Sequence, residues 1–147
     1  MRIEADWPAA STTMSIETSE RLPEDEVAVV HFRSEGLQVV FLGDLGHGLA
    51  ETELAPLRGA EVVLVPAGGP PTIDYSDIPT LLDQIGPRIV IPMHFKTPRI
   101  NLVIQPLERF LEIVGGTPVE RRKTSSIEIT RATLPTQRTI VVLEHAR

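Results

Sequence analysis

The residues best suited to chemistry are an aspartate and two histidines that lie in or beside abrupt strand ends. Asp44 and His47 belong to the stretch Leu42–Gly48, where three glycines within six positions end an apolar run. His94 directly follows a second apolar run, Ile89–Met93. Carboxylate oxygens and imidazole nitrogens, without sulfur, suit a divalent metal such as zinc or manganese. We therefore expect Asp44 and His94 to share one metal, with His47 as a third ligand if its ring turns inward.

Each of these residues also has an ordinary structural interpretation. Asp-Leu-Gly is common turn material, so Asp44 could be a turn former only. His94 could be a core histidine with a satisfied ring nitrogen, and His47 could bond to a neighbouring carbonyl. Both loops follow predicted strands, at the edge where open α/β sheets place their ligands, and this favours a shared site. The sequence contains no Walker-type phosphate loop and no Gly-x-Ser-x-Gly nucleophile elbow.

A few polar residues on the same loops could line a substrate pocket. Lys96 follows His94 by two residues and could meet an anionic substrate group, although it could equally be a solvated lysine. We do not expect His145, close to the C-terminus, to be a ligand. The predicted pocket residues are Thr72, Asp74 and Lys96, with Thr97 beside them.

Composition narrows the class of protein. A chain of 147 residues with 41% hydrophobic and 23% charged residues is expected to form a single domain over residues 1–147. A net charge of −6 argues against nucleic acid or an anionic membrane as the main partner. The basic cluster Arg121–Lys123 is interpreted as a solvated turn. The absence of cysteine, of a membrane-length apolar stretch and of a secretory signal pattern predicts a cytoplasmic protein.

Apolar periodicity predicts an α/β fold in which helices pack against a mixed sheet. The clearest helix has Ile78, Leu81, Leu82 and Ile85 on one face, with Ser76 as its expected N-cap and Gly86 as its end. Further helices are expected over Glu51–Arg58 and from Pro106 to Gly115. A hairpin with a three-residue loop, Ser34–Gly36, is expected between two strands. The predicted strands are Met1–Asp6, Met14–Ile16, Val27–Arg33, Leu37–Leu42, Glu61–Val65, Arg88–Ile91, Ser126–Thr130 and Thr139–Leu143.

Three stretches carry a family resemblance: Leu42–His47, Val63–Gly69 with Thr72 and Asp74 after it, and Pro87–Pro98. They resemble the metallo-β-lactamase superfamily, and within it the small metal-dependent hydrolases similar to ascorbate-6-phosphate lactonase. The resemblance runs from about Val27 to the C-terminus and implies an αββα sandwich. It implies that Asp44 is a metal-bridging carboxylate and His94 the last histidine ligand. It also implies hydrolysis of a small-molecule substrate by a metal-bound hydroxide, because the metal lowers the pKa of its water to about 7.

The chain departs from this family in its first part. The family motif His-x-His-x-Asp-His is absent, no histidine precedes His31, and the place of a further family histidine, near Ala10 and Ser11, holds none. Only the C-terminal half of the sandwich is therefore matched: a mixed sheet with helices on one face. We expect either a hydrolase completed by a second chain, or a catalytically inactive binding or assembly module. A homo-oligomer whose two copies pack sheet to sheet and share a metal is the third interpretation.

Overall fold

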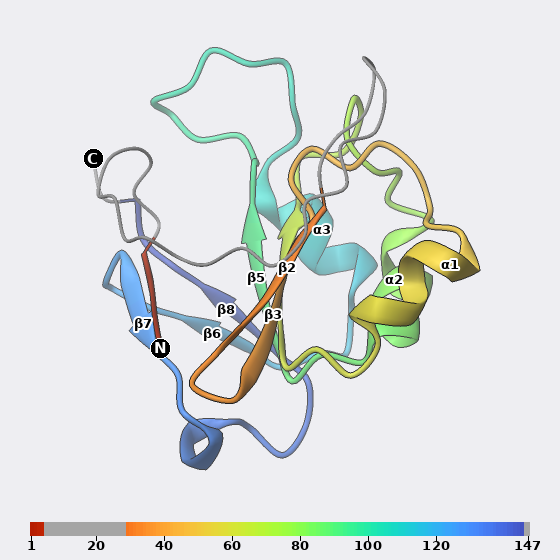
Figure 1. Cartoon of the computed structure of the whole chain (residues 1–147). Helices are drawn as coiled ribbons and strands as arrows, with labels where there is room; N and C mark the ends of the chain where they lie inside the picture. The colour runs from red at the N-terminus through yellow and green to blue at the C-terminus, as the bar shows by residue number, and fades with distance from the viewer. Residues whose placement is uncertain (5–28, 146–147) are drawn as a thin grey trace.

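The computed structural model describes residues 1–4 and 29–145, and they form a mixed α/β fold around one large sheet (Figure 1). The hairpin strands at one edge pair antiparallel, and all other neighbours in this sheet pair parallel. From that edge the strands are β2 (Val30–Ser34), β3 (Leu37–Phe41), β4 (Val62–Pro66), β5 (Ile89–Met93), β8 (Thr139–Val142) and β6 (Val119–Arg121). The predicted mixed sheet is confirmed.

The α-helices pack on one face of this sheet. They are α1 (Glu51–Leu54), which continues as the 3₁₀ turn η1 (Ala55–Leu57), α2 (Ile78–Ile85) and α3 (Leu107–Ile113). The predicted apolar face of α2 is buried, with Ile78 and Leu82 at most 1% exposed, and it joins Val40, Val63 and Val90 of the sheet in one core. Burial of each such side chain contributes about 1.5–3 kcal/mol, which fixes the helix on the sheet.

The opposite face of the sheet is covered in part by a small second sheet. Strand β1 (Arg2–Glu4) pairs antiparallel with β7 (Ser126–Glu128), and Ile127 and Ile129 pack with Leu37, Val39 and Val62 in a second core. Figure 1 shows β7 on one side of the large sheet and α1 and α2 on the other. Among the described residues, α1, α2 and α3 pack on one face of the large sheet, as the sequence predicted.

Two predicted details are wrong. The hairpin loop contains only Glu35 and Gly36, because Ser34 still pairs with Leu37; both loop residues have positive φ, 51° and 77°. Ser76 does not cap α2. The helix begins after Asp77, and Ser76 donates its backbone N–H and its hydroxyl to Asp74 Oδ1, each at 2.8 Å.

The ends of the other elements follow local chemistry. Gly86 ends α2 as predicted, with φ 78° and its N–H bonded to the Leu82 carbonyl. The helix predicted over Glu51–Arg58 tightens into η1 at Pro56. Strand β6 was not predicted. The predicted strand Met14–Ile16 lies outside the described residues, as do Ala10 and Ser11.

Within the part of the chain that the structure describes, no helix is long and apolar enough to cross a membrane.

Candidate metal centre

Asp44 and His94 stand at matching positions in the sheet. Val40 of β3 is in register with Val63 of β4, which is in register with Val90 of β5. Asp44 comes four residues after Val40, and His94 comes four residues after Val90. Because neighbouring strands lie about 4.8 Å apart, β3 and β5 are separated by about 9.6 Å, with β4 between them. For the two side chains to meet, each must therefore lean toward the other over the end of β4.

The two side chains meet over that strand end. His94 Nε2 lies 3.7 Å from Asp44 Oδ1, beyond the roughly 2.7–3.2 Å of a direct hydrogen bond. Two ligands of one tetrahedral metal, each about 2.1 Å from it, lie about 3.4 Å apart. The imidazole is 28% exposed and the carboxylate 66% exposed, so the space beside them is open to solvent. An oxygen donor and a nitrogen donor thus lie at a separation that suits a divalent cation between them.

The backbone turns sharply at both donors. His94 has φ 50°, in the left-handed region that a non-glycine residue rarely adopts, and Gly43 before Asp44 has φ 56°. The conformation at His94 costs about 1 kcal/mol or more, so it persists only where surrounding contacts impose it. Strain of this kind concentrates at functional sites, which makes His94 a functional candidate on conformational grounds as well.

The loop after β4 supplies the contacts that hold His94. The Ala67 N–H donates to the Met93 carbonyl at 2.8 Å. The backbone of Gly68 lies against the next carbonyl, since a Cβ built on Gly68 would lie 2.4 Å from the His94 oxygen. Only glycine allows this approach. Sequence reasoning missed Gly68, although the Gly-Gly pair after a buried strand was a visible signal.

The ring of His94 is not that of a satisfied core histidine. Its Nδ1 is buried and has no hydrogen-bond partner among the residues that the structure describes. Buried ring nitrogens nearly always have a partner, and an exception often marks a binding or catalytic role. His94 is therefore not a core histidine whose ring nitrogens are both hydrogen-bonded.

His47 is not brought to this pair. Its Nδ1 lies 2.7 Å from the carbonyl oxygen of Gly48, and the residue is exposed. The interpretation in which His47 bonds to a neighbouring carbonyl is thus the observed one. Within residues 1–4 and 29–145, no group of three or more histidine, cysteine or carboxylate side chains could hold a metal ion. The described residues supply two donors, not three.

Two of the predicted pocket residues organise their own loop. Thr72 is buried and donates its hydroxyl to the Gly69 carbonyl at 2.8 Å. Asp74 accepts from the backbone N–H and the hydroxyl of Ser76, and these two bonds hold the pKa of the Asp74 carboxyl below its ordinary value. Tyr75, which follows, donates its hydroxyl to the Ala67 carbonyl at 3.0 Å, and burial raises the pKa of its phenol. These bonds join residues of the same loop and hold the segment that follows β4 in one shape.

Lys96 is half-buried, and two of the three N–H donors of its ammonium are used within its own loop. Its Nζ donates to the carbonyls of Ile100 at 2.8 Å and Leu102 at 2.7 Å. Thr97 beside it is buried, and its hydroxyl accepts from the Arg99 N–H at 3.3 Å. Both residues therefore fix the loop that follows the metal-binding candidate His94.

Comparisons with known proteins identify the family of this chain. Residues 10–94, more than half of the chain, match the model of a β-lactamase superfamily domain. A UPF0173 protein of Pyrococcus furiosus is 41% identical over 61 residues, which cover 41% of this chain and 28% of that protein. The crystal structure of a proposed zinc-dependent hydrolase of the metallo-β-lactamase superfamily from Thermotoga maritima is similar, with a TM-score of 0.71 and 32% sequence identity. The likeness covers 80% of this chain but 58% of that one, so the chain spans less than two thirds of either protein. On this evidence the chain belongs to the metallo-β-lactamase superfamily.

Proposed function

We propose that the chain is the C-terminal half of a metal-dependent hydrolase that holds a divalent metal between Asp44 and His94. The observation that carries the proposal is the 3.7 Å separation of Asp44 Oδ1 and His94 Nε2, which come from loops fifty residues apart. The strained backbone of His94 supports it. Superfamily membership favours hydrolysis. The branch similar to ascorbate-6-phosphate lactonase, a small-molecule substrate and a cytoplasmic location remain parts of the proposal.

The two donors fit a metal but do not complete its site. Zinc or manganese accepts carboxylate and imidazole ligands, and a catalytic zinc normally has three protein ligands. The missing ligands are those of the family motif His-x-His-x-Asp-His, which the sequence lacks. We propose that a second polypeptide supplies them. When bound, the metal would lower the pKa of a coordinated water to about 7. Asp44 and His94 would hold it at the sheet edge, and the loops braced by Tyr75 and Lys96 would shape the space beside it.

A second candidate function is a metal-free binding or assembly module. It is favoured by the finding that the described residues bring together only two possible ligands. A symmetric pair of chains that contributes two donors each would reconcile that finding with metal binding. Metal stoichiometry separates these cases.

The test is metal content after equilibration of the purified chain with zinc or manganese and removal of free metal. We expect bound metal in the wild type, at one ion per chain or one per two chains as read against mass in solution. Substitutions Asp44→Ala and His94→Ala should each weaken binding more than a hundredfold, because loss of an outer-shell partner alone costs about 10–100-fold. His47→Ala is the matched control, since that ring lies in the same loop as Asp44 but bonds to its own neighbour.

Two results would contradict the proposal. One is metal content that is unchanged by Asp44→Ala or His94→Ala while circular dichroism shows the native fold. The other is a wild-type chain that retains no metal at any concentration, alone or with a polypeptide carrying the missing motif. The second result would favour the assembly module.

A further inference from the structure

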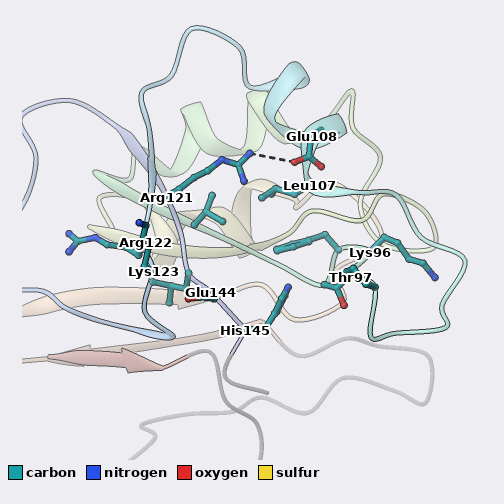
Figure 2. A pocket seen from close by; sticks show the side chains of 13 residues that line it. Lys96, Thr97, Leu107, Glu108, Arg121, Arg122, Lys123, Glu144 and His145 are labelled. Carbon is teal, nitrogen blue, oxygen red and sulfur yellow. Dashed lines mark hydrogen bonds and ion pairs between the residues drawn. The ribbon is translucent and has the colours of Figure 1, made fainter.

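A hollow of about 320 Å³ opens at the same edge of the sheet, and Figure 2 shows the side chains that line it. The hollow lies where β5, β8 and β6 end, and Phe95, the residue after His94, forms part of its wall. Asp44 follows β3, two strands away from β5 in the sheet, on the side away from β8 and β6. Ligand pockets range from about 300 to 1,000 Å³, so the hollow has the size for a small ligand. Of its lining, the metal-site proposal uses only the loop held by Lys96.

The floor of the hollow is apolar. Leu107 at the start of α3 is 5% exposed, and Val142 at the end of β8 is 7% exposed. The Phe95 ring adds a half-buried aromatic wall, with its centroid 5.6 Å from that of His145. A ligand could therefore bury a flat or aliphatic body here and remove apolar surface from water.

The rim of the hollow carries positive charge. Arg121, Arg122 and Lys123, at the end of β6 and just after it, all line the hollow. Arg122 already forms an ion pair at 2.7 Å with Glu120, which does not line the hollow, so Arg121 and Lys123 are the cations best placed to meet a ligand. The Arg122 N–H also donates to the Val142 carbonyl, so pairing with β8 fixes the strand that presents the two cations.

The two rim cations are available to a ligand. Arg121 reaches across the hollow to Glu108 (Figure 2), but at 3.5 Å and with both side chains more than half exposed the contact is loose. Lys123 has no ion pair within the described part of the chain. Figure 2 shows His145 rising from the opposite side and the amino end of Lys96 pointing away. The lining contains four basic residues against Glu108 and Glu144, in a chain whose net charge is −6.

We propose that this hollow binds a small organic anion, with its carboxylate held by Arg121 and Lys123 and its apolar body against Phe95 and Val142. A guanidinium presents two parallel donors that match a carboxylate, and the ammonium adds a second positive charge. The apolar floor selects an anion with a hydrophobic body over a bare inorganic one. This inference is independent of the metal site, because none of these four side chains is a proposed ligand.

The test is a titration of the metal-free, full 147-residue chain with benzoate, acetate or inorganic phosphate. Binding is measured from the amide chemical shifts. Benzoate should shift the amides of residues 95–97, 107–108 and 121–123, and the shifts should saturate. Acetate, which keeps the charge but lacks the apolar body, should bind at least fivefold more weakly. Arg121→Gln should weaken benzoate binding about tenfold, the loss expected for one charge-assisted hydrogen bond.

Arg109→Gln is the matched control. Arg109 and Arg121 are each 55% exposed, and each pairs with a glutamate of α3. The control should leave benzoate binding unchanged. The proposal is overturned if benzoate does not saturate, if acetate or phosphate binds as tightly as benzoate, or if Arg109→Gln and Arg121→Gln weaken binding equally. Because no metal and no activity enter the measurement, these outcomes do not depend on the hydrolase proposal.

Discussion

Gly68→Ala tests the packing that holds His94 in place. A Cβ at position 68 would lie 2.4 Å from the His94 carbonyl oxygen and 3.1 Å from Ile104 Cβ. The first contact is about 1 Å shorter than ordinary van der Waals contact. Gly68 does not have a positive φ, so the effect of alanine is steric and not a backbone preference. Either the Gly68 backbone or the His94 carbonyl must move.

Neither the Gly68 backbone nor the His94 carbonyl can move freely. The Gly68 carbonyl accepts from the Gln105 N–H at 2.8 Å, and the residue before it donates to the Met93 carbonyl at 2.8 Å. His94 already has φ 50°, so further rotation there adds strain. Overpacking of this kind costs about 1–3 kcal/mol. For a chain of this size we expect the melting temperature to fall by roughly 3–10 °C.

The assay is thermal unfolding followed by circular dichroism, with Gly48→Ala as the matched control. Gly48 has no atom within 4 Å of a built Cβ and no positive φ, so alanine there should change the melting temperature by little. If Gly68→Ala has the same melting temperature as Gly48→Ala and the wild type, the close approach of the two loops is not what holds His94. Metal content of Gly68→Ala then tests the proposed site separately: a displaced imidazole should bind metal more weakly, even at temperatures where the variant is folded.

Two further predictions concern the loops beside the site. Asp74→Asn should lower the melting temperature at pH 7, because the Ser76 bonds lower the pKa of this carboxyl in the folded chain and so stabilise its charged form. That contribution is present above the unfolded pKa of about 3.9 and is lost as pH falls through the folded value. The difference in melting temperature between Asp74→Asn and the wild type should therefore narrow below about pH 4. A difference that stays constant at all pH values would refute this prediction. Asp77→Asn is the control, because the Asp77 side chain makes no cap bond. Lys96→Met should speed amide hydrogen exchange in residues 97 and 99–105 about tenfold, because the ammonium no longer binds the Ile100 and Leu102 carbonyls. Unchanged exchange, or an equal change in Lys123→Met, would show that Lys96 does not brace this loop.

Much of the fold followed from local patterns because each pattern has a local physical cause. The spacing of Ile78, Leu81, Leu82 and Ile85 predicts a buried helical face, and the structure buries all four. Gly86 ends that helix because its left-handed conformation costs glycine nothing. Capping was less predictable. Ser76 and Asp77 are both good N-cap types, and the choice between them depended on Asp74, which binds Ser76 instead.

Strand β6 shows where local patterns stop being informative. All three of its residues are exposed, and it contains no apolar alternation that would predict a strand. It is extended because β8 offers an unpaired edge, to which it bonds in parallel. The same pairing turned a predicted solvated turn, Arg121–Lys123, into the rim of a hollow.

The sequence by itself determined which side chains are available: one aspartate after a glycine-broken strand, one histidine after a buried strand, and no family motif to complete their site. It also determined the helices and the buried strands, because hydrophobic periodicity acts over a few residues. Only the tertiary structure decided that Asp44 and His94 meet and that His47 does not join them. That outcome depends on β4 lying in parallel register between β3 and β5, and on the Gly68 backbone pressing against His94. Such distances are set by pairing between segments remote in the chain, which no local pattern encodes.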